Sequence, residues 1–286
     1  MNIAISGITG MIGQALSDHL LGNDHCVTGI GRQDFQNGVE HLAEKLKGID
    51  AVINLAGAPL LQRWSQKNKT EILRSRVDTT AALVTAMNQM SAPPGCFIAA
   101  SAVGIYDPYE VHDEYSTAYD DDFPAEVCKA WEQEALKVDA DKVRLSIMRL
   151  GVVLSQSGGA LKKMLLPFRL GLGGKIGEGF QPMPFIHIAD LTNAIEWLVL
   201  HPQEKGVFNM VAPSMVSNEE YTKALGIVLH RPTFMTIPEF ALKMIYGDAA
   251  QILTKGQKVL PKRLREDGFV FEFPDIHSAL FYLLKK

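Results

Sequence analysis

Short apolar runs alternate with amphipathic segments along the first half of the chain. Strand-like runs rich in β-branched and apolar residues occupy residues 2–6, 26–30, 51–57 and 96–101. In the segments between them, apolar residues recur at the period of one helical face. Strands that alternate with helices in this way predict an α/β fold, namely a Rossmann-type doubly wound parallel sheet with helices on both faces.

The longest amphipathic segment, residues 70–90, carries one apolar stripe. The stripe consists of Ile72, Val77, Thr80, Leu83, Val84 and Met87. Its spacing predicts a helix. Two explanations for the apolar face stay open, which are burial against the sheet and a contact between two copies of the chain in a homodimer.

The second half of the chain contains two more strand-like runs, at residues 144–154 and 206–213. The glycine-rich residues 171–180 between these runs predict a flexible loop. Asp190 precedes a run with helical periodicity, so we expect its side chain to cap the N-terminus of a helix.

Beyond Pro213 the pattern is mainly helical and is interrupted by prolines. We therefore expect a nucleotide-binding Rossmann domain at residues 1–160, to which a strand returns near residues 183–212. The remaining residues, 161–286, are expected to form a smaller, mostly helical C-terminal lobe that contributes to substrate binding.

Three glycines lie three residues apart where the first predicted strand passes into the first predicted helix: Gly7, Gly10 and Gly13. At such a junction the first glycine permits a tight turn, the second lets backbone N–H groups approach a diphosphate, and the third lets the helix pack closely on the sheet. The helix N-terminus attracts an anion there. Because the spacing differs by one residue from G-x-G-x-x-G, a turn without a ligand is the alternative.

Arg32 follows the second predicted strand, at the position where an enzyme that binds NAD presents an acidic residue to the ribose 2′-hydroxyl. A guanidinium at this position can bind the 2′-phosphate of NADP with paired hydrogen bonds. The sequence therefore predicts NADP(H) as the cofactor. A solvated surface arginine is the alternative, because single charges are common at strand ends.

Composition and charge exclude several other classes of protein. The 286 residues carry a formal net charge of -4, which leaves no basic surface for nucleic acid. The apolar stretch at residues 195–200 is too short to span a membrane, and the first residues read as a strand rather than a secretory leader, so we expect a cytoplasmic protein.

Cys26, Cys96 and Cys128 are widely separated and no histidine cluster has metal-ligand spacing. We therefore expect no metal, and thiols that are small buried hydrophobes in a reducing compartment.

Five motifs stand in the order in which a known family has them: the turn at residues 7–13, NLAG at 54–57, ASAVGIY at 100–106, RLGVV at 149–153 and FIHIAD at 185–190. With these motifs the chain resembles the extended short-chain dehydrogenase/reductases of the NAD-dependent epimerase/dehydratase family. A narrower resemblance, to the sugar-nucleotide-epimerase-like branch, rests on residues 127–132, 167–174 and 259–264.

The resemblance implies a set of cofactor-binding residues at the ends of the strands. They are Gly7, Thr9, Gly10, Met11, Ile12, Gly13, Arg32, Leu55, Ala56, Gly57, Ser101, Gly151 and Val152. It also implies a small-molecule substrate, either a small carbonyl compound or a nucleotide sugar, that binds between the cofactor and the C-terminal lobe.

Members of this family with established activity use a serine, and a tyrosine followed four residues later by a lysine. Ser101 matches the serine, whereas the resemblance puts Pro124 at the tyrosine position and Cys128 at the lysine position. Lys129 is displaced by one residue, a rotation of about 100° around a helix. Cys128 either packs beside the cofactor or takes part in catalysis. Tyr106 is a further catalytic candidate, with a half-buried tyrosine bonded to backbone as the alternative.

Two functions from different classes fit these residues. The first is an NADP(H)-dependent oxidoreductase or epimerase that lacks the usual tyrosine and lysine. The second is a non-catalytic NADP(H)-binding sensor or partner-docking protein.

Arg76 is either a residue that contacts the substrate or a phosphate, or an exposed partner in an ion pair. His187, in an apolar segment, is expected to orient a loop.

Overall fold

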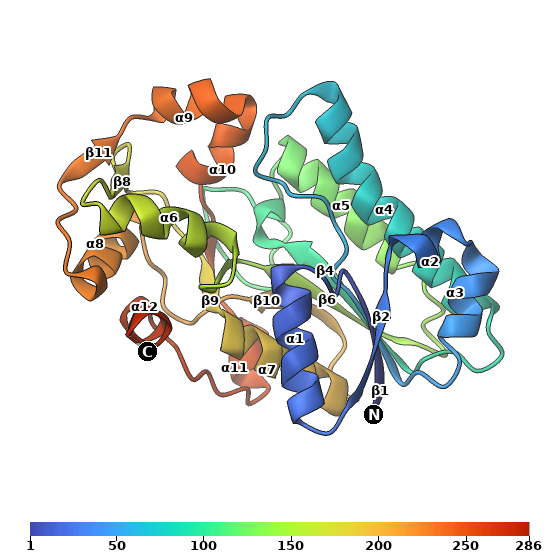
Figure 1. The fold of residues 1–286 in the computed structure, drawn as a ribbon. Coiled ribbons are helices and arrows are strands. Elements are labelled where there is room, and N and C mark those ends of the chain that lie inside the picture. The colour runs from blue at the N-terminus through green and yellow to red at the C-terminus, as the bar shows by residue number, and fades with distance from the viewer. Residues whose placement is uncertain (286) are drawn as a thin grey trace.

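A six-stranded parallel sheet is the central element of the computed structural model, which describes residues 1–285 (Figure 1). Its strands are β1 (Asn2–Ser6), β2 (Cys26–Ile30), β3 (Ala51–Asn54), β4 (Cys96–Ala102), β6 (Arg144–Leu150) and β10 (Gly206–Met210). The strand order is β10-β6-β4-β3-β1-β2, and every neighbouring pair is parallel. The Rossmann-type doubly wound sheet is therefore confirmed. The order reverses between β1 and β3, and such a switch point opens a crevice at the carboxyl ends of the strands.

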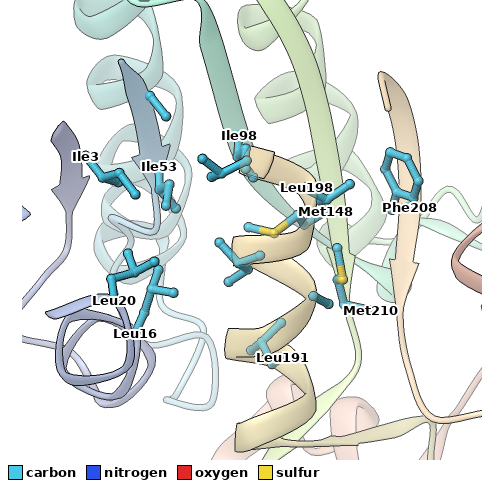
Figure 2. Packing of buried hydrophobic residues seen from close by; sticks show 14 of the residues in the cluster. Ile3, Leu16, Leu20, Ile53, Ile98, Met148, Leu191, Leu198, Phe208 and Met210 are labelled. Carbon is cyan, nitrogen blue, oxygen red and sulfur yellow. The ribbon is translucent and has the colours of Figure 1, made fainter. Parts of the chain in front are cut away.

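Helices cover both faces of this sheet. One face packs against α1 (Met11–Gly22) and α7 (Ile188–Leu200), whose buried leucines, among them Leu16 and Leu198, meet Ile53 and Met148 of the sheet (Figure 2). The opposite face packs against α3 (Val39–Lys45), α4 (Gln66–Gln89) and α5 (Phe123–Ala135). A short helix, α2 (Arg32–Gln36), follows β2 directly.

Helix α4 has the apolar stripe that its spacing predicts, and the stripe is buried. Leu83, Val84 and Met87 belong to the hydrophobic cluster that contains Val52 and Phe97 of the sheet. Burial against the sheet therefore accounts for the stripe, and the stripe gives no reason to expect a second subunit on α4.

The C-terminal region is mainly helical, as the sequence predicts. Its principal cluster joins α6 (Gly159–Arg169), α8 (Asn218–Leu229) and α12 (Ile276–Leu284) to the paired strands β7 (Val152–Leu154) and β9 (Phe185–His187). The remaining elements are short. They are β5 (Val111–His112), β8 (Gly174–Ile176), β11 (Met235–Ile237), β12 (Lys258–Val259), α9 (Glu239–Tyr246), α10 (Gln251–Thr254), α11 (Lys262–Glu266), η1 (Val103–Ile105) and η2 (Gly247–Ala250). The division at residue 160 stays a prediction.

The single strand predicted at residues 144–154 is in fact two strands. They separate at Gly151, where a Cβ atom would lie 2.8 Å from the carbonyl oxygen of Pro184. β6 ends just before this glycine and remains in the main sheet, while β7 begins just after it and pairs with β9. The backbone of a distant segment thus ends the strand at a position that the apolar pattern does not mark.

Three further expectations are wrong in whole or in part. The glycine-rich segment at residues 171–180 contains strand β8, which pairs with β11, and a side chain at Gly174 would collide with the backbone of Met235. The N-cap of α7 is His187, whose Nδ1 accepts a hydrogen bond from the N–H of Ala189 at 3.0 Å. Asp190 instead accepts hydrogen bonds from the backbone N–H groups of Glu272 and Phe273. Finally, Cys26 is exposed, although Cys96 and Cys128 are buried as expected.

Across residues 1–285, no helix combines the length and the apolar character that a membrane span requires. The same residues contain no group of three or more histidine, cysteine, aspartate or glutamate side chains arranged to hold a metal ion. A cytoplasmic location stays a prediction.

Candidate functional site

A cavity of about 380 Å³ opens at the carboxyl ends of β1, β3, β4 and β6. Most of the residues expected at the cofactor line it, namely Gly7, Gly10, Met11, Ile12, Gly13, Leu55, Gly57, Ser101 and Gly151. The remaining residues expected at the cofactor are absent from the lining among the described residues; they are Thr9, Arg32, Ala56 and Val152. The catalytic candidate Tyr106 is absent from this lining as well. The cavity therefore coincides with the switch point of the sheet.

The glycine turn has the backbone geometry that its spacing requires. Gly7 has a φ of +73°, and a Cβ atom there would lie 2.9 Å from the carbonyl carbon of Leu55. A Cβ atom at Gly13 would lie 2.7 Å from the Cα of Ile8 and would also collide with the carbonyl oxygen of Gly7. Only glycine satisfies both positions without backbone movement.

The N-terminus of α1 faces this cavity. Gly10 is its N-cap and has no side chain to satisfy the first N–H groups, and Met11 and Ile12 of the first turn line the cavity. N–H groups in the first turn of a helix have no intrahelical acceptor. Together with the helix dipole they form a site suited to a phosphate.

Arg32 is the first residue of α2, directly after β2, and its side chain is exposed. The acidic residue nearest along the chain, Asp34, is already bonded. It accepts hydrogen bonds from the N–H of Gly31 at 2.7 Å, from Lys45 at 2.8 Å and from His41 at 3.0 Å. Partial burial alone would raise the pKa of Asp34, but these bonds lower it to about 2. The Asp34 carboxylate is therefore ionised and already occupied by its neighbours. The Arg32 guanidinium remains available to bind a ligand.

Ser101, at the end of β4, belongs to a buried charged network. Its hydroxyl donates to Oε1 of Glu132 at 2.6 Å. Arg149 of β6 binds the same carboxylate through Nε at 2.9 Å and Nη2 at 2.8 Å. Burial alone would lower the pKa of Arg149, but its bonds to Glu132 raise it above its usual value. Because the hydroxyl hydrogen points to Glu132, the Ser101 oxygen can accept a hydrogen bond from a ligand.

Tyr106 lies on the far side of this network and is fully buried. Its hydroxyl donates to Oδ1 of Asn209 at 2.9 Å or to the carbonyl oxygen of Asp113 at 3.0 Å, and it accepts from Arg149 at 2.8 Å. Burial, partly offset by Arg149, raises the pKa of Tyr106 to about 12. The structure thus places this phenol among protein partners, whereas Ser101 reaches the cavity.

Helix α5 forms one wall of the cavity. Asp122 caps its N-terminus by accepting a hydrogen bond from the N–H of Ala125, and Pro124, Val127 and Cys128 line the cavity. Burial raises the pKa of Cys128 to about 11, so its thiol is neutral at physiological pH.

Lys129 points away from the cavity, as the rotation by one residue predicts. Its Nζ donates to the carbonyl oxygen of Asp120 at 2.6 Å, and the residue is absent from the cavity lining in the part of the chain that is described. It cannot provide a cation next to a bound ligand without a local rearrangement.

Buried hydrogen bonds fix the elements below the cavity. Ser6 of β1 donates to Asn54 of β3, which donates to Oγ1 of Thr80 in α4 at 2.8 Å. The indole N–H of Trp131 in α5 donates to the same hydroxyl at 2.9 Å. Two strands and two helices are thereby held in register, and Trp131 is fixed in the wall of the cavity.

The pair of Glu132 and Arg149 is not evident as a functional unit from the sequence alone. The signal that could have found it is Arg149 itself, a charge that directly follows the apolar residues Ile147 and Met148 in the predicted strand, because a buried charge requires a partner. The identity of that partner depends on how α5 packs on the sheet, which the local pattern does not contain.

Residues 3–211 match the NAD dependent epimerase/dehydratase family, and residues 237–283 match a domain of unknown function, DUF1731. The chain is 38% identical over 289 residues to the epimerase family protein SDR39U1 of Mus musculus, with 98% of each chain covered. The crystal structure of human epimerase family protein SDR39U1 with NADPH is 35% identical, with a TM-score of 0.94 and 100% of both chains covered. A nucleoside-diphosphate sugar epimerase from Corynebacterium glutamicum is 29% identical, with a TM-score of 0.80 over 99% of this chain and 59% of that chain.

Proposed function

The chain belongs to the NAD dependent epimerase/dehydratase family, and on this premise we propose that it binds NADP(H) and acts as an oxidoreductase or epimerase. The substrate class is a small carbonyl compound or a nucleotide sugar. The NADPH bound by human SDR39U1 supports the cofactor, and the Corynebacterium glutamicum nucleoside-diphosphate sugar epimerase supports the nucleotide sugar.

The observation that carries the proposal is that one cavity joins the N-terminus of α1 to the hydroxyl of Ser101. Met11 and Ile12 would hold the diphosphate with their backbone N–H groups, whereas the N–H of Gly10 already donates to the carbonyl oxygen of Gly7 at 3.0 Å. A bound nicotinamide supplies hydride transfer to or from carbon. The residues around it need only orient the ligand and move a proton.

Ser101 and Glu132 provide a path for that proton. When a hydroxyl is oxidised, the Ser101 oxygen accepts its proton while the proton of Ser101 passes to Glu132, along the 2.6 Å hydrogen bond that joins them. When a carbonyl is reduced, the transfers run in reverse, from a Glu132 that has taken a proton from solvent, through Ser101, to the substrate oxygen. Arg149 balances the charge of the carboxylate in its resting state. This arrangement replaces the absent tyrosine with a serine that is already bonded to a base.

The second function, a cofactor sensor without catalysis, is favoured by helix α5. Pro124 has no proton to give, and the Cys128 thiol is neutral, so neither side chain supplies the family's acid and cation. Under this alternative the cavity binds NADP(H), and a partner recognises the cofactor-bound protein. A second copy of the chain, which would form a homodimer, is one such partner.

Nicotinamide turnover separates the two functions. Full-length protein mixed with NADPH and a panel of aldehydes, quinones and nucleotide sugars is expected to oxidise the cofactor with at least one of them. Ser101→Ala is expected to slow that reaction by about 100-fold or more, because it removes the proton path. Tight NADPH binding without turnover on any substrate would instead identify the sensor.

Arg32→Asp is expected to weaken NADPH binding by roughly 10- to 100-fold and to leave NADH binding nearly unchanged. The reason is that a charge-assisted bond to the 2′-phosphate is lost and replaced by repulsion. Calorimetric titration with both nucleotides measures the difference. Arg265→Asp, an equal change of charge at an exposed residue of α11, is the control. An equal loss for NADPH and NADH would show that Arg32 does not bind the 2′-phosphate.

A further inference from the structure

Arg76 of α4 is the one charged residue among those that line the cavity in the described chain. Its guanidinium lies against Gly57, where a Cβ atom would be 3.0 Å from Cζ, and its Cζ is 5.2 Å from the centre of the Trp131 ring. One N–H, from Nη1, donates to the carbonyl oxygen of Ile72 at 3.0 Å. The side chain is therefore held in place, with most of its N–H donors unassigned.

No carboxylate in residues 1–285 forms an ion pair with Arg76, although the side chain is partly buried. Burial lowers its pKa, and the adjacent Cys128 only partly offsets this effect. The nearby carboxylate of Glu132 is already paired with Arg149. A partly buried cation without a counter-ion destabilises a protein. An anionic group of a bound ligand would compensate this charge.

We propose that Arg76 is an anion-binding residue of the cavity and receives a phosphate or carboxylate group of a bound ligand. The guanidinium presents a planar set of donors that matches two oxygens of such a group. It approaches from α4, beside Trp131 and Cys128, whereas the glycine turn approaches from α1. The cavity thus has two separate sites for negative charge, one of backbone N–H groups and one of a side chain.

This anion has two chemical sources. One is the diphosphate of the dinucleotide, and the other is an acidic group of the substrate, such as the diphosphate of a nucleotide sugar. The inference rests on the proposed function only in that ligands enter this cavity. It does not require turnover, so a binding measurement tests it independently of catalysis.

The test is calorimetric titration of full-length protein with NADPH, with inorganic pyrophosphate, and with UDP-glucose after saturation with NADP⁺. Arg76→Gln is expected to weaken at least one of these by roughly 10- to 100-fold. Arg76→Lys, which keeps the charge but loses the planar fork, is expected to weaken it less. Arg74→Gln, at an exposed arginine two residues away on the same helix, is the matched control and should change affinity less than about twofold.

The pattern of loss identifies the source of the anion. Weaker NADPH and pyrophosphate binding assigns Arg76 to the dinucleotide, and weaker UDP-glucose binding alone assigns it to the substrate. Either result supports the proposal. Wild-type affinity of Arg76→Gln for all three ligands would overturn it, as would a wild-type protein that binds none of them.

Thermal melting without ligand checks folding, and the loss of an unpaired cation should not lower the melting temperature. Normal NADPH turnover with unaltered binding by Arg76→Gln would leave the proposed function intact while rejecting this inference.

Discussion

Replacement of Gly13 by alanine is expected to lower the affinity for NADPH by about 100-fold or more and to destabilise the protein by about 1–3 kcal/mol. The added Cβ atom would lie 2.7 Å from the Cα of Ile8 and would overlap the carbonyl oxygen of Gly7. Both atoms are backbone, so the strain must be relieved by moving the turn or by tilting α1. Either movement displaces the N–H groups of Met11 and Ile12 that would hold the diphosphate.

Gly22→Ala is the control for this substitution. Gly22 is the last residue of the same helix, and a Cβ atom there would meet nothing within 4 Å. Alanine favours helix by up to about 1 kcal/mol over glycine, so this variant should be at least as stable as the wild type and bind NADPH equally. Calorimetric titration and thermal melting of both variants make the comparison. Undiminished NADPH binding by Gly13→Ala would refute the assignment of the diphosphate to the N-terminus of α1.

Arg149→Met is expected to destabilise the protein by about 3–5 kcal/mol, because it leaves the carboxylate of Glu132 buried without its cation. The two side chains are 3% and 10% exposed, so solvent cannot replace the lost partner. Arg149 also donates to the hydroxyls of Tyr106 and Tyr119, and both bonds disappear with it. Urea denaturation measures the loss.

Two comparisons isolate the buried charge as the cause. Lys47→Met breaks an exposed ion pair with Glu44 and should cost less than about 1 kcal/mol. The double variant Arg149→Met, Glu132→Leu removes both buried charges and should recover much of the lost stability, while Ser101 loses its hydrogen-bond acceptor. If Arg149→Met proved as mild as Lys47→Met, the network would contribute little to folding.

The sheet and the glycine turn could be predicted because each depends on local pattern. The period of apolar residues changes from that of a strand to that of a helix within short segments. Gly7 and Gly13 belong to one short turn, so their spacing is visible in the local sequence. The strand order was not predicted, because parallel strands joined by helices allow more than one arrangement and the local pattern does not select among them.

Features that depend on distant backbone could not be predicted in the same way. Gly151 divides β6 from β7 because Pro184 approaches it, and no residue near Gly151 signals that approach. His187, not Asp190, caps α7, because the helix begins earlier than its apolar residues indicate. The partners of Ser101 and Arg149 lie on α5, so their network exists only once this helix packs on the sheet.

The position of β10 has a consequence for biosynthesis. The chain leaves β6 at Leu150 and returns to pair with it only at Gly206. Until the ribosome has released this last strand, β6 is an open edge with apolar residues and unpaired backbone groups, and such an edge recruits other chains. Any nascent or truncated polypeptide that stops before Gly206 therefore exposes an aggregation-prone border, and the closing strand protects the sheet only late in synthesis.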